Sequence, residues 1–147
     1  MSFLSGERIT AARLNRLAPV TYEAIESGIL TRTTTTYADI PDATVTFSTV
    51  AANAVIVVDA EFDCAVGTLS AGTDMNGRVM VDGVAGTRLA KHQMDDEDRD
   101  SVYMFEKFTL ASAGSHTVKL QGALSAASGS GTFQAFTSLK VTVYEVV

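Results

Sequence analysis

The spacing of hydrophobic and polar positions changes once along the chain, at about residues 28–31. Before that point the apolar residues are spaced as on short helices. After it they alternate with polar residues nearly to the last position, with the period of half-buried β-strands. The pattern therefore predicts an N-terminal arm with one or two short helices over residues 1–29, followed by a β domain over residues 30–147.

The first expected helix lies at the start of the arm. Thr10 is placed to cap a helix that runs to about Ala18, where Pro19 ends it. Ile9 and Leu14 have the spacing of a hydrophobic staple around that cap.

A second helix start is weaker. Thr21 repeats the capping pattern, and Gly28 could stop the helix. The segment is short, however, and Val20 and Tyr22 also suit an extended chain.

The arm is interpreted as a docking segment, because its first 17 residues are too few to add much to a core. The alternative is a helix that packs on its own domain. The expected docking residues are the apolar and basic side chains of the arm: Phe3, Leu4, Arg8, Ile9, Arg13, Leu14, Arg16 and Leu17.

The β domain contains about eight expected strands. They cover residues 31–37, 43–50, 54–66, 78–81, 86–93, 101–111, 116–124 and 132–147. Turn signals separate them, and no helical crossover lies between them. This favours a mainly β fold, an antiparallel β-sandwich that is most simply a jelly roll. An immunoglobulin-like sandwich is the main alternative, but its paired cysteines and core tryptophan are missing.

The clearest strand, at residues 54–66, has one face that is apolar along its whole length. Its other face is apolar at Val55 and Val57 and acidic at Asp59, Glu61 and Asp63. Only part of that second face should meet water. The apolar part predicts an oligomer contact at Val55 and Val57.

The formal charge of −6 is unevenly placed. Residues 1–32 are close to neutral, so the acidic excess belongs to the β domain. An acidic domain is a poor partner for phosphates and for anionic lipid, and we expect no nucleic-acid and no membrane partner. No signal peptide and no membrane-spanning stretch is recognised, so synthesis in the cytoplasm is expected.

Cys64 is the only cysteine, so no internal disulfide can form. Its place in an alternating strand predicts a buried, unreactive thiol.

An acidic run at residues 95–100 is the first candidate for chemistry. Asp96, Asp98 and Asp100 match the first three ligand positions of a calcium loop. The match then fails, because Ser101 and Lys107 stand where glycine and glutamate are needed. A solvated loop is expected, and ion binding by this run stays open.

The other candidate residues, which are strand carboxylates and two histidines, do not form a recognisable catalytic pattern. Asp59, Glu61 and Asp63 suit a solvated strand face better than a glycosidase pair. His92 and His116 have no partner at a recognised ligand spacing, and His116 is expected at an exposed turn. Neither a nucleophile elbow nor a phosphate-binding glycine loop is present. The sequence predicts no catalytic residue, no metal ligand and no cofactor, and therefore a protein that is not an enzyme.

Two parts of the chain resemble small virion proteins of tailed bacteriophages. The segment SGERITAARLNRL, residues 5–17, is similar to the "G-x-x-(I/L/V)-T-A-x-x-L-N-x-L" opening of many phage tail and accessory structural proteins. AGSHTVKL at 113–120 and LKVTVYEVV at 139–147 resemble their jelly rolls of the tumour-necrosis-factor type. The resemblance covers most of the chain through short motifs. It implies a non-enzymatic virion component, commonly a trimer held by apolar sheet faces, on the capsid or the tail.

We therefore expect a virion protein that docks by its arm to other virion proteins and displays a homotrimeric β-sandwich. It would serve as a capsid decoration or minor tail protein. The alternative is a tail-tip module that binds a host receptor or glycan through loops 67–77, 94–100 and 125–131. Few exposed aromatic residues are expected, which argues against a sugar platform.

Overall fold

The computed structural model describes residues 10–145, without the side chain of Arg13. Within this range one helix precedes eleven strands. The elements are α1 (Ala11–Leu17), β1 (Val20–Ile25), β2 (Leu30–Arg32), β3 (Ala38–Thr49), β4 (Val55–Thr68), β5 (Asp74–Val81), β6 (Val84–Ala85), β7 (Ala90–Gln93), β8 (Arg99–Thr109), β9 (Gly114–Leu124), β10 (Ser130–Phe133) and β11 (Ser138–Tyr144).

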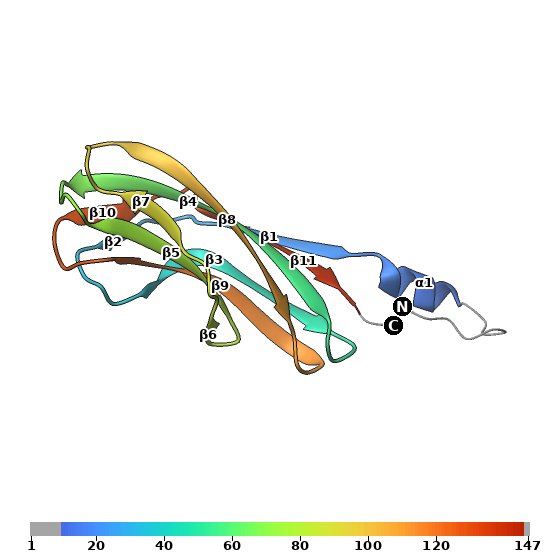
Figure 1. The fold of residues 1–147 in the computed structure, drawn as a ribbon. Helices are drawn as coiled ribbons and strands as arrows, with labels where there is room; N and C mark the ends of the chain where they lie inside the picture. The colour runs from blue at the N-terminus through green and yellow to red at the C-terminus, as the bar shows by residue number, and fades with distance from the viewer. Residues whose placement is uncertain (1–9, 146–147) are drawn as a thin grey trace.

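The strands form two antiparallel sheets that pack face to face (Figure 1). The first sheet has the order β1-β11-β4-β10-β2, and β8 pairs with the other side of β4. The second sheet has the order β3-β9-β5-β6, with β7 also paired to β5. The expected mainly β, antiparallel sandwich of jelly-roll type is confirmed.

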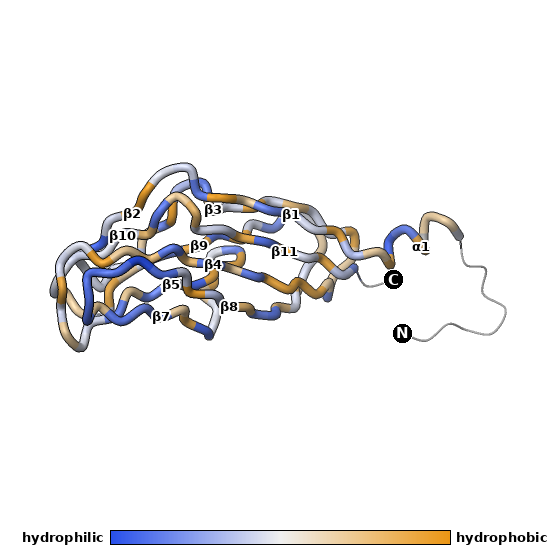
Figure 2. Tube along the Cα trace, turned by 90° about the horizontal axis from the view of Figure 1, so that it is seen from above, coloured by the Kyte–Doolittle hydropathy of each residue, from blue (hydrophilic) through white to orange (hydrophobic). Residues whose placement is uncertain are grey.

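The core lies between the sheets and follows the predicted alternation. The inward residues of β4 are buried, including Ile56, Val58 and Phe62, and polar and apolar stretches alternate along the strands (Figure 2). The ring of Phe62 meets that of Phe133 edge to face, with centroids 6.0 Å apart. Gly77 makes room for this pair, because a Cβ there would come within 2.4 Å of Phe62. Each such buried ring contributes roughly 1.5–3 kcal/mol to stability.

The strand count exceeds the expected eight for three reasons. Residues 20–25 form an additional strand, the two-residue strand β6 lies between the expected strands 78–81 and 86–93, and the segment 132–147 divides into two. Between β10 and β11 the chain makes a turn, in which the backbone N–H of Thr137 donates to the carbonyl of Gln134 at 3.0 Å.

The first arm helix is confirmed. α1 begins after Thr10, whose carbonyl accepts a hydrogen bond of 3.0 Å from the N–H of Leu14. It ends before Pro19, which has no N–H to continue the helix. α1 lies beyond one end of the sandwich in both views (Figure 1, Figure 2).

The second arm helix was a wrong prediction. Residues 20–25 form β1, which pairs antiparallel with β11 over its whole length. The ring of Tyr22 stacks on that of Phe47 in β3, with centroids 5.5 Å apart. A helix this short has a large nucleation cost, whereas a strand gains a full ladder and an aromatic contact. The β structure therefore begins at Val20, before the boundary expected at residue 30.

Candidate docking and interaction surfaces

The described part of the arm presents an apolar side chain to solvent. Leu14 is 53% exposed, while Arg16 and Leu17 are half-buried. Arg13 lies in α1. Four expected docking residues lie outside the described residues: Phe3, Leu4, Arg8 and Ile9.

The second candidate surface is the outer face of the first sheet, formed by β1, β11, β4 and β8. Val57 is half-buried there and lies between Thr142 of β11 and Lys107 of β8. Val55 is likewise half-buried, beside Tyr144. The two predicted interface residues therefore share one outward face, with polar and aromatic neighbours on both sides.

The acidic end of this face is partly neutralised. Asp59 lies between Lys140 of β11 and Phe105 of β8. The hydroxyl of Tyr103 donates to the carboxylate of Asp59, and this bond raises the pKa of Tyr103. Glu61, opposite Tyr103, is exposed as expected.

Asp63 does not share that solvated face, which corrects the sequence prediction. The alternation slips here, so that Phe62, Asp63 and Cys64 are all buried. Arg99 binds the Asp63 carboxylate through two hydrogen bonds, Nε–Oδ1 at 2.8 Å and Nη2–Oδ2 at 2.6 Å. The guanidinium in turn lies 5.7 Å from the ring centre of Phe136.

An aromatic hollow lies on β8, against the expectation of few exposed aromatics. Tyr103 is 62% and Phe105 is 49% exposed. The guanidinium of Arg88 lies 4.5 Å from the Phe105 ring centre and donates to the Phe105 carbonyl at 3.2 Å. With Leu89 and Met104 these residues line a hollow of about 450 Å³.

A buried carboxylate holds the loop that carries Arg88. Glu106 points inward from β8 and accepts from the N–H and the hydroxyl of Thr87, at 2.7 and 2.8 Å. A Cβ at Gly86 would come within 2.2 Å of this carboxylate, so a larger residue there would have to displace the Glu106 side chain. An inward charge of this kind also protects an edge strand from further pairing.

Three loops that follow β4, β7 and β9 meet at the end of the sandwich opposite α1 (Figure 1). The N–H of Ser70 donates to the carbonyl of Met94 at 3.0 Å, and its hydroxyl bonds that of Ser128 at 2.8 Å. These are the loops expected at 67–77, 94–100 and 125–131. The first is shorter than expected, because β5 already begins at Asp74.

His116 is not at an exposed turn, which is a second correction. It is 3% exposed, and its Nδ1 lies 2.7 Å from Oδ2 of Asp82. Its Nε2 lies 3.2 Å from both the Thr49 hydroxyl and the Ser112 carbonyl. Burial opposes ionisation of Asp82, but the bonds from His116 and from the N–H of Thr117 outweigh it and lower the pKa of Asp82.

The Thr49–His116–Asp82 arrangement resembles a nucleophile, base and orienting acid only in outline. The Ser112 carbonyl, which can only accept a hydrogen bond, lies as close to Nε2 as the Thr49 hydroxyl does, so Nε2 is not dedicated to that hydroxyl. Thr49 is itself buried. The cluster ties β9 to the β5–β6 hairpin and to β3.

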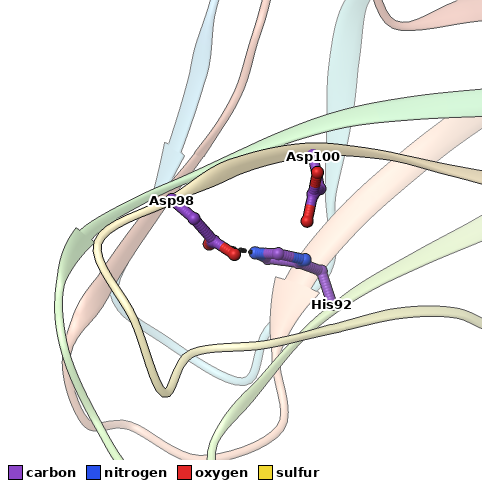
Figure 3. Close-up of side chains that lie close together, drawn as sticks. All are labelled: His92, Asp98 and Asp100. Carbon is purple, nitrogen blue, oxygen red and sulfur yellow. Dashed lines mark hydrogen bonds and ion pairs between the residues drawn. The ribbon is translucent and has the colours of Figure 1, made fainter.

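His92 gains the partners that its sequence spacing did not reveal. Nε2 of His92 lies 2.9 Å from Oδ1 of Asp98, and Asp100 lies beside them (Figure 3). Asp96, the first aspartate of the calcium-loop pattern, is not in this group.

Cys64 is buried, as predicted. Burial raises the pKa of its thiol to about 12, and the carboxylates of Asp63, Asp100 and Asp98 act in the same direction. The thiolate is therefore not formed near neutral pH, and the thiol is unreactive.

Glu26, just after β1, is a buried carboxyl group that the sequence did not single out. Burial raises its pKa to about 7. The hydroxyl of Thr137 opposes this shift, and the carboxylates of Asp63 and Asp42 add to it.

None of the helical residues described here forms a helix long and apolar enough to cross a membrane.

Comparisons with known proteins identify the fold. No protein-family model matches the chain. No curated protein sequence matches it either. Among solved structures, the VP2 subviral particle of infectious bursal disease virus matches with a TM-score of 0.57 and 12% identity, over 86% of this chain and 33% of that one. Eiger, a tumour necrosis factor of S. frugiperda, matches with a TM-score of 0.52 and 8% identity, over 88% of this chain and 93% of that one. The chain thus spans about a third of the viral protein, and at such identities the likeness establishes the β-sandwich fold alone.

Proposed function

We propose that the chain is a non-enzymatic structural protein of a tailed-bacteriophage virion. Its N-terminal arm docks on the capsid or tail, and its sandwich is displayed as a homotrimer, as a capsid decoration or minor tail protein. The observation that carries this proposal is that α1 lies at one end of the molecule and three joined loops lie at the other (Figure 1). A protein held by one end and displayed by the other requires this arrangement.

The composition of α1 supports docking. A helix of seven residues is marginal on its own, and a partner surface would stabilise it. Its exposed Leu14 gives that partner an apolar contact. The phage-like motif at residues 5–17 includes this helix.

The outer face of the first sheet is the proposed trimer contact. Val55 and Val57 form its apolar part, and β8 adds exposed aromatic rings at its acidic end. A closed ring of three subunits would bury one such face per subunit without leaving an open end. The fold is shared with a viral particle protein and with a tumour necrosis factor, which is compatible with this role.

Removal of residues 1–18 tests the docking role. This deletion leaves β1 intact, whereas removal of 1–29 would also strip β11 of its partner strand. The shortened protein should fold, with the melting temperature and oligomeric mass of the full chain, but should be missing from purified particles. Mass spectrometry of particles assembled with each version measures incorporation.

A point variant keeps the chain length constant in the same assay. Leu14→Asp places a charge on the exposed apolar position of α1 and should also reduce incorporation. Normal incorporation of the protein without residues 1–18 would refute arm docking, and so would its failure to fold.

A second candidate function is recognition of a host receptor or glycan. The convergence of three loops opposite α1 favours it, because loops held together on a rigid sandwich commonly carry binding. The hollow formed by Tyr103, Phe105 and Arg88 adds aromatic rings and a cation. Saturable attachment of the protein without residues 1–18 to host cells would favour this function.

A further inference from the structure

We propose that His92, Asp98 and Asp100 form a binding site for a divalent transition-metal ion, for which zinc fits best. One imidazole nitrogen and one oxygen from each carboxylate lie within 4.8 Å of one another. Both carboxylates are directed towards the His92 ring (Figure 3). An ion placed among three such donors can reach all of them after small side-chain rotations.

The backbones that carry the donors are held by the sheets. His92 lies on β7 of the second sheet, and Asp100 lies on β8 of the first sheet opposite Cys64 of β4. The carbonyl of Asp98 accepts a hydrogen bond of 3.0 Å from the N–H of Val66. The convergence therefore comes from strands of both sheets and not from a single flexible loop.

The buried imidazole distinguishes this group from an ordinary acidic surface. His92 is 8% exposed, while Asp98 and Asp100 reach solvent. An ion can enter from the solvent side, where water completes its coordination. In the metal-free state the proton shared by His92 and Asp98 forms a hydrogen bond, and the ion takes its place.

The donor set selects the class of ion. Calcium and magnesium prefer oxygen ligands alone, whereas zinc and its neighbours accept imidazole nitrogen together with carboxylate oxygen. Three protein ligands and one water give the tetrahedral arrangement that zinc favours. The site therefore differs from the calcium loop suggested by Asp96, Asp98 and Asp100, because His92 takes part and Asp96 does not.

The negative charge around the site also favours binding of a cation. Residues 95–100 contain five carboxylates and one basic residue, Arg99, which is bound to Asp63. Within residues 10–145, no lysine or arginine forms an ion pair with Asp98 or Asp100. A bound divalent ion would offset part of this excess and join β7 to β8, where the edges of the two sheets meet.

Calorimetric titration of the untagged full-length protein with zinc chloride tests the site. We expect one saturable site per chain and weaker binding of calcium chloride. Asp100→Asn should weaken zinc binding roughly tenfold or more, because it removes a ligand. Asp96→Asn makes the same charge change in the same loop outside the group, and should alter binding by less than about twofold.

The melting temperature provides a second measurement of zinc binding that does not depend on the heat of binding. Zinc should raise the melting temperature of the protein and of Asp96→Asn, but not that of Asp100→Asn or Asp98→Asn. Equal loss of binding in Asp96→Asn and Asp100→Asn would overturn the proposal, since it would indicate diffuse attraction. Absence of saturable zinc binding, or calcium binding as tight as zinc binding, would overturn it too.

Discussion

A carboxyl group with a pKa near neutrality lies just after β1. The folded pKa of Glu26 is about 7, above its usual 4.5. Between these values the unfolded chain loses the proton while the folded chain keeps it. The contribution of Glu26 to stability is therefore full below pH 4.5, falls as the pH rises, and is lost above pH 7.

Glu26→Gln should remove this pH dependence. Between pH 4.5 and pH 7 the native protein should lose up to about 3 kcal/mol of unfolding free energy through Glu26, and the variant should not. Urea denaturation at pH 5 and pH 8 measures the difference. Glu23→Gln, at an exposed position of β1, is the control and should behave as the native protein does. Identical pH slopes for Glu26→Gln and the native protein would contradict the assignment.

The aspartates with lowered pKa act in the opposite direction. Hydrogen bonds from Lys119 and Gln121 lower the pKa of Asp39, and those of His116 and Thr117 lower that of Asp82. Their stabilisation is present above their usual pKa of 3.8 and is lost as the pH falls below it. The pH range over which Glu26 affects stability therefore lies above the range of the two aspartates, and the two effects can be measured separately.

The burial of individual residues was predictable from the sequence where the two-residue alternation of a strand alone decides it. Cys64 follows the alternation and is buried as expected. Asp63 and His116 are buried by partners distant in sequence, Arg99 and Asp82 respectively, which no local pattern reveals. The group around His92 is hidden for the same reason.

At the scale of elements, local sequence signals located most strands and the first helix. They did not reveal where a long expected strand is interrupted, as between β10 and β11. Asp82 and Gly83, an Asp-Gly dipeptide of the kind that favours hairpin turns, both have positive φ between β5 and β6. β1 was mistaken for a possible helix because its capping pattern is local, whereas its pairing with β11 spans almost the whole chain. Pairing of this kind is a tertiary effect that overrides a weak helix signal.

Val57→Glu should dissociate the proposed trimer without unfolding the subunit. In the free subunit the new carboxylate lies opposite Lys107 of β8, which can neutralise it. Inside a subunit contact an uncompensated charge costs about 3 kcal/mol or more, or roughly a hundredfold in association. Light scattering at micromolar concentration measures the mass.

Thr46→Glu provides the matched control for that substitution. Thr46 is exposed on the outer face of the second sheet, so this change should leave the mass unaltered. A native protein that is monomeric under these conditions would contradict the trimer. An unchanged mass for Val57→Glu would remove Val57 from the interface.

At the scale of the whole molecule, the arm helix and the sandwich are divided in space, but not at residues 28–31, where the hydrophobic period was expected to change. α1 stands beyond one end of an elongated sandwich, and the loops after β4, β7 and β9 close the other end (Figure 1). Because β1 belongs to the first sheet, the division falls at Pro19. This arrangement supports the proposed docking by the N-terminal arm.

Immunogold labelling of intact phage particles tests virion display most directly. Antibodies raised against the protein without residues 1–18 should place gold at regular positions on the capsid or tail of particles that contain the full chain. Particles that lack the protein should stay unlabelled. The account is contradicted if purified particles contain no such protein, or if it is present but inaccessible to antibody on intact particles.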